Sequence, residues 1–142
     1  MAGGTAECEI DHIGIAVSDL DGAEAFFGQL LGVRPAHREE VAGDGIQASF
    51  FDLGHGSLEL IGATEPDSSL ARFLSRRGPG LHHVAYRVAD LEKELRRWRE
   101  LGAELIDEHP RPGARGRLVA FIQPRSALGV LTELCQLPPG SR

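Results

Sequence analysis

Apolar and polar positions alternate in two segments of the chain, and a helical pattern follows each of them. In "DHIGIAV", positions 11–17, and in "HHVAYRV", positions 82–88, bulky apolar side chains occupy every second position, as in half-buried strands. Apolar residues then recur at spacings of three and four, which predicts two amphipathic helices that end at glycines. The helical stripes are Leu20, Ala23, Phe27, Leu30 and Leu31 before Gly32, and Leu91, Leu95, Trp98 and Leu101 before Gly102. The expected N-caps are Ser18 or Asp19 in the first helix and Asp90 in the second.

These two patterns are copies of one another, offset by 71 positions. His12 falls on His83 and Asp19 on Asp90. Extended segments follow each helix: "IQASFFDL" and "SLELIG" in the first half, "LVAFIQP" and "GVLTELC" in the second. Each half therefore predicts a strand, a helix and two or three further strands.

A single domain is expected from 142 residues. "DSSLARFLSRRGPG" predicts a short helix and a linker between the two halves. The expected organisation is a loose tail over 1–9, a domain over 10–136 with modules at about 10–64 and 80–136 joined by a helix at 67–78, and a tail over 137–142.

Charge and composition exclude several classes of protein. A formal net charge of −6 argues against a broad attraction to nucleic acid or to an anionic membrane. No apolar run approaches the length of a membrane span, and "MAGGTAECE" has the features of neither a secretory signal nor a transit peptide. The expected location is therefore the cytoplasm. Cys8 and Cys135 are interpreted as two buried free thiols.

The alternation also separates the two histidines at positions 82 and 83. In the first strand His12 shares a face with Gly14 and Ala16, and in the second His83 shares a face with Ala85 and Arg87. The opposite, bulky face is expected to pack on the helix. His83 should therefore face a cavity, and His82 should turn toward the core.

Two glutamates occupy matching positions in the extended segments, Glu59 in "SLELI" and Glu133 in "LTELC". A buried carboxylate costs several kcal/mol unless it is paired or bound to a metal. Two imidazoles and two carboxylates suit a divalent metal with coordination positions left for water or substrate. The duplicated His/Glu pair therefore predicts a metal site.

With these residues in view, the chain resembles the vicinal oxygen chelate, or glyoxalase-like, superfamily, and within it the methylmalonyl-CoA epimerases. The resemblance rests on "IDHIGIAVSDLDGAEAFFGQLLG", "DLGHGSLELIG", "DSSLARFLSRRGPGLHHVAYRV" and "FIQPRSALGVLTEL". It covers the chain from about Ile10 to Gln136. It implies an α+β fold in which tandem βαβββ modules form a U-shaped mixed or antiparallel sheet around a metal site.

By position, the resemblance implies metal ligation by His12, Glu59, His83 and Glu133, with Glu133 also acting as a catalytic base. The implied metal is Co²⁺, with Mn²⁺, Ni²⁺, Zn²⁺ and Fe²⁺ as alternatives. The implied activity is interconversion of (R)- and (S)-methylmalonyl-CoA, or a close 2-substituted acyl-CoA, through a metal-stabilised enolate. A homodimer is also implied, without nucleic-acid or membrane partners. The rival functions are a glyoxalase I-type lyase acting on glutathione hemithioacetals and a non-catalytic protein that sequesters a ligand.

One departure from the family concerns the second base. Some epimerases carry a glutamate where this chain has Ala48. Glu40, Asp44 and Gln47 lie nearby in sequence, although an amide cannot act as a base at neutral pH, and a water molecule is a further alternative. The family's "HPKD" is replaced by "QPRS". The remaining histidines, His37, His55 and His109, are expected in loops, and the candidates for coenzyme A phosphates are Arg76, Arg77, Arg111, Arg115 and Arg117.

Overall fold

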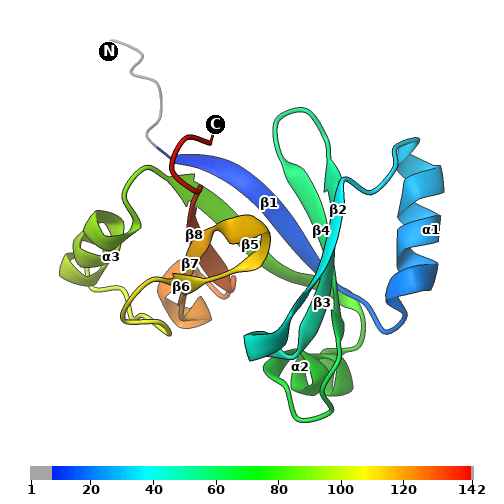
Figure 1. Cartoon of the computed structure of the whole chain (residues 1–142). Coiled ribbons are helices and arrows are strands. Elements are labelled where there is room, and N and C mark those ends of the chain that lie inside the picture. Colours follow the sequence, from blue (N-terminus) through cyan, green and yellow to red (C-terminus); the bar gives the residue numbers. More distant parts are fainter. Residues whose placement is uncertain (1–7, 142) are drawn as a thin grey trace. The chain divides into compact units, whose positions relative to one another are not determined.

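Each half of the chain folds into one strand, one helix and three further strands (Figure 1). The structure is a computed structural model, and it describes residues 8–141. The first module consists of β1 (Cys8–Ala16), α1 (Leu20–Leu31), β2 (His37–Val41), β3 (Ile46–Asp52) and β4 (Ser57–Ala63). The second consists of β5 (Gly80–Val88), α3 (Leu91–Glu100), β6 (Arg111–Pro112), β7 (Leu118–Ile122) and β8 (Thr132–Gln136). Helix α2 (Ser69–Arg77) joins them, and the expected α+β class with tandem βαβββ modules is confirmed.

Contacts divide the described chain into two units, and the division falls within β1 and within β5. The first unit comprises residues 12–83, and the second comprises residues 8–11 and 84–141. Residues 1–7 of the expected N-terminal tail lie outside the described residues, and β1 begins at Cys8. Among the described residues, no helix is both long and apolar enough to cross a membrane.

The first unit is a sheet in the order β2-β3-β4-β1 with α1 against one face (Figure 1). β3 pairs antiparallel with β2 and β4, whereas β1 and β4 are parallel. Asp19, one of the two N-caps expected from the sequence, caps α1 by accepting a hydrogen bond from the Gly22 amide at 3.1 Å. The core between helix and sheet contains Val17, Leu20, Phe51 and Leu60. The opposite face of this sheet is left for the functional side chains.

The second unit repeats this arrangement with strands in the order β5-β8-β7-β6 and a core against α3. Asp90 caps α3 by accepting from the Lys93 amide at 3.1 Å. The core consists of Val88, Leu91, Leu95, Ala120, Ile122 and Leu134.

A buried ion cluster fixes the beginning of β1 in the second unit. The carboxylate of Asp11 is fully buried and lies 3.0 Å from the Arg87 guanidinium and 3.4 Å from that of Arg117. Removing either partner of such a buried pair is strongly destabilising, because it leaves a buried charge uncompensated. Arg117, a candidate for a coenzyme A phosphate, is therefore mostly buried within a structural cluster.

Several expectations were wrong in detail. The polar segment "HREEV" forms strand β2, so His37 lies in a strand and not in a loop. Cys8 is exposed, whereas Cys135 is buried, and both are free thiols. The helical stripes also extend past the core, because Leu30 is 65% exposed and Leu101 is 74% exposed.

Candidate metal centre

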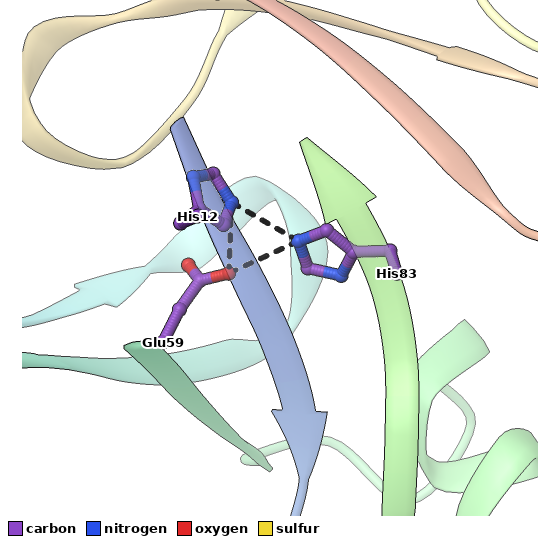
Figure 2. A group of neighbouring side chains, drawn as sticks. All are labelled: His12, Glu59 and His83. Carbon is purple, nitrogen blue, oxygen red and sulfur yellow. Dashed lines mark hydrogen bonds and ion pairs between the residues drawn. The ribbon is translucent and has the colours of Figure 1, made fainter. Parts of the chain in front are cut away.

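Three of the four predicted ligands come together in the first unit, each from a different strand (Figure 2). His12 lies on β1, Glu59 on β4 and His83 on β5, and all three are buried. Because β1 and β4 are parallel, with His12 opposite Ser57 and Gly14 opposite Glu59, the His12 and Glu59 side chains share one face of the sheet. This is the face opposite α1.

The three donor atoms form a nearly equilateral triangle. His12 Nε2 lies 3.1 Å from His83 Nε2 and 3.4 Å from Glu59 Oε1, and His83 Nε2 lies 3.2 Å from the same oxygen. A triangle with these sides has a circumradius of about 1.9 Å, so a point about 2.1 Å from all three atoms lies about 1 Å from their plane. That distance is the usual bond length from a divalent first-row metal to nitrogen and oxygen ligands. The residues therefore fit a divalent cation.

The electrostatics of the triangle also favour a cation. Burial acts to raise the pKa of Glu59, but hydrogen bonds with His12 and His83 outweigh it and lower the pKa to about 2. The carboxylate is therefore ionised at neutral pH. A buried anion facing two imidazole nitrogens is a donor set in which a divalent ion neutralises the charge.

Gly14 makes room for the His83 ring. A Cβ atom at position 14 would lie 2.1 Å from Cε1 of His83 and 2.7 Å from its Nε2. Any larger residue at position 14 would displace this imidazole from the triangle. Strand alternation predicts that Gly14 lies on the cavity face, but its role depends on how closely the two strands approach, which the sequence does not show.

His82 contacts both an apolar side chain of helix α2 and the neighbouring His83. Its ring packs edge-on against Phe73 of α2, with centroids 4.8 Å apart, and its Nδ1 lies 2.9 Å from Nδ1 of His83. Burial, with the positive charge of His83 as the second cause, lowers the pKa of His82 to about 4. A neutral ring bonded to the distal nitrogen of a ligand histidine fixes the orientation of that ligand.

The fourth predicted ligand, Glu133, lies on β8 in the second unit. It is buried, and its Cα partners in the sheet are Phe121 on β7 and Ala85 on β5. Its assignment as a ligand still rests on its correspondence with Glu59 in the repeat, and it remains a prediction.

Strand alternation also shows on which face of the sheet the candidates for a second base lie. Glu40 and Gln47 are Cα partners on the face that carries Arg38, whose guanidinium binds Asp21 and Glu24 of α1. They therefore lie on the helix side of the sheet and not on the face of the metal centre. Glu39, which was not among the candidates predicted from the sequence, has its side chain on the other face. The alternation of His37, Glu39 and Val41 is the signal that could have identified it.

The comparisons with known proteins agree with this geometry. The family model of the Glyoxalase/Bleomycin resistance protein/Dioxygenase superfamily matches residues 11–121. The chain is 41% identical to the uncharacterized protein YqjC of Bacillus subtilis, over 94% of both chains. It is 32% identical to the ethylmalonyl-CoA/methylmalonyl-CoA epimerase of Cereibacter sphaeroides, over 90% of this chain and 97% of that one.

Among solved structures, the methylmalonyl-CoA epimerase of Streptomyces coelicolor in complex with 2-nitronate-propionyl-CoA superimposes with a TM-score of 0.89. The two chains are 31% identical, over 92% of this chain and 95% of that one. The resemblance to methylmalonyl-CoA epimerases that the sequence indicated is thus confirmed. The relatives from Cereibacter sphaeroides and Streptomyces coelicolor are both named as epimerases. The chain belongs to the Glyoxalase/Bleomycin resistance protein/Dioxygenase superfamily.

Proposed function

We propose that this chain is a divalent-metal-dependent epimerase that interconverts the (R) and (S) forms of methylmalonyl-CoA or of a close 2-substituted acyl-CoA. The observation that carries the proposal is the buried triangle of His12, Glu59 and His83, whose donor atoms are 3.1–3.4 Å apart. The relatives named as epimerases of methylmalonyl-CoA supply the substrate class.

The proposed ligand set is His12, Glu59, His83 and Glu133, with Co²⁺ as the first candidate metal. A divalent cation held by these residues would supply Lewis acidity, which stabilises negative charge that develops on the substrate oxygens. His12 and His83 must present neutral Nε2 atoms to it, and His82 keeps the His83 ring in that orientation.

Epimerisation also needs proton transfer at the carbon between the thioester and the carboxylate. Glu133 is the proposed base for one face of this carbon, because a buried carboxylate can take up the proton and return it. A second group must serve the other face. We further propose that the protein is a cytoplasmic homodimer. Size-exclusion chromatography with light scattering would test whether it is a dimer.

Incubation of the Co²⁺-loaded protein with methylmalonyl-CoA in deuterated water tests the function. Deuterium should enter the α-position while the two epimers interconvert, and removal of the metal with a chelator should abolish both. The same protein should be given the hemithioacetal of glutathione and methylglyoxal. Formation of lactoylglutathione without α-deuteration would establish the lyase instead, and inactivity toward both substrates despite tight metal binding would refute the epimerase.

A further inference from the structure

A second pair of titratable side chains lies on the same face of the first unit's sheet as the metal centre. Residues directly opposite one another in adjacent strands project to the same face. Glu59 is opposite Phe50, and Phe50 is opposite His37. In the next row along the sheet, Ala48 is opposite Glu39. Glu39 and His37 therefore share the face that carries Glu59.

Ala48, directly opposite Glu39 on this face, is a small residue. Directly opposite side chains have Cβ atoms about 4.5–5.5 Å apart, so a large residue at position 48 would cover the path from Glu39 to the metal centre. Ala48 is completely buried and contributes only a methyl group. Phe50, in the adjacent row, packs against His37 at 6.4 Å and against His12 at 5.9 Å between ring centroids. A single aromatic ring thus packs against both His37 and the proposed ligand His12.

Glu39 is held in place and can still exchange protons with water. His37 Nε2 lies 2.9 Å from Glu39 Oε1, and the side chains are 40% and 30% exposed, respectively. A general base must lie within hydrogen-bond reach of the proton that it abstracts, and a carboxylate held in one orientation meets this condition more readily than a free one.

The other acidic or amide side chains near this site are less well placed. Glu40 and Gln47 lie on the opposite face, and Asp52 lies at the end of β3, where it accepts a hydrogen bond from Ser57 at 2.7 Å. Of the described acidic residues on β2, β3 and β4 in this unit, Glu39 combines the correct face, a small neighbour and a hydrogen-bonded histidine.

We propose that Glu39 is the second catalytic acid–base group, with His37 as the residue that positions its carboxylate. This proposal rests on the proposed epimerase function. The carboxylate of Glu39 takes the α-proton from one face of the substrate carbon, and the electron pair of the broken C–H bond passes to the thioester oxygen as the enolate forms. The carboxylic acid of Glu133 then returns a proton to the other face, which inverts the centre. The reverse reaction uses the two groups in exchanged roles.

Glu39→Gln tests the proposal through the exchange of each epimer separately in deuterated water. Loss of one base should reduce interconversion at least about 100-fold, the usual contribution of general acid–base catalysis. One epimer should lose α-proton exchange, whereas the other should still exchange its proton through Glu133 without inversion. Metal affinity should remain that of the wild type. The matched control is Glu40→Gln, a change in the neighbouring exposed residue on the opposite face, which should leave both exchange rates unaltered.

Three further variants separate catalysis from structure. Formate should partly restore the exchange lost in Glu39→Ala, because a small carboxylate can occupy the space of the missing one. His37→Gln keeps an N–H donor and should retain more of kcat than His37→Phe, with little change in KM for either.

The possible results distinguish this proposal from the proposed function. A wild-type protein that exchanges neither epimer contradicts the epimerase itself. An active wild type whose Glu39→Gln variant exchanges both epimers at full rate, or loses both equally, overturns the role of Glu39 and leaves the epimerase standing.

Discussion

Replacement of Gly14 by alanine should weaken metal binding and leave the protein folded. The new Cβ would lie 2.1 Å from Cε1 of His83, whereas non-bonded carbons approach to about 3.5 Å, so the imidazole must retreat by about 1.4 Å. Metal–ligand distances tolerate deviations of about 0.2 Å. Nε2 of His83 would therefore leave the position from which it is proposed to bind the metal. The affinity for Co²⁺ should fall at least about 100-fold, which corresponds to about 2.8 kcal/mol.

Titration calorimetry with Co²⁺, with chelator competition for the tighter wild type, measures this change. Gly62→Ala is the matched control. It also replaces a glycine on a strand of the first unit, but its Cβ would meet Leu20 at 3.4 Å, an ordinary contact on the helix side. This control should bind the metal as the wild type does, and urea denaturation should show both variants folded. Wild-type affinity in a folded Gly14→Ala protein would refute the assignment of His83 as a ligand held over Gly14.

Three further outcomes are expected. His83→Ala should abolish tight metal binding. His82→Ala should retain it with about tenfold lower affinity, because only an orienting hydrogen bond of 2.9 Å is lost. Equal losses of affinity in calorimetry would contradict this difference between the two histidines. Leu128→Asn should raise the free energy of unfolding by about 1 kcal/mol, because Leu128 is fully exposed and has a left-handed φ of 58°. An unchanged midpoint of urea unfolding would argue against backbone strain at this position. A thiol reagent should modify the exposed Cys8 rapidly and Cys135 only on unfolding, because burial raises the pKa of the Cys135 thiol. Rapid modification of both cysteines in the folded protein would contradict this.

The parts of the fold with a strong apolar alternation were predictable from sequence. β1 and β5 both have it, and the repeat reinforced each prediction. β2 was missed because His37, Arg38, Glu39 and Glu40 are polar on both faces, so no apolar side of the strand is visible in the sequence. What makes this segment a strand is its pairing with β3, which is a tertiary effect.

The ends of the helices show a similar limit. The spacing of Leu30 continues the stripe of α1, and that of Leu101 continues the stripe of α3, yet both side chains are exposed. A period of 3.6 residues gives the side of a helix that faces the sheet, but not how far along the helix the sheet extends.

The candidate site was predictable in its residue types and not in its geometry. The internal repeat pairs His12 with His83 and Glu59 with Glu133, and so identified these positions as candidate ligands. Their convergence depends on the parallel pairing of β1 with β4 and on the space above Gly14, and neither can be derived from the sequence alone. The pairing of Glu39 with Ala48 could not be predicted either, because it depends on the register of β2, a strand that was not expected.

The neighbouring residues Asp11 and His12 give β1 an unusual sensitivity to insertion and deletion. Asp11 is held by Arg87 and Arg117 in the second unit, and His12 is held by Glu59 and His83 in the first. A shift of the strand by one position would bring Asp11 to the place of His12 or His12 to the place of Asp11, and would put an isoleucine in the place left behind. Each buried environment suits only its present occupant. A single residue added or deleted between His12 and Ala16 should therefore abolish stable folding and metal binding together, although it would lie far in sequence from most of the residues it disables.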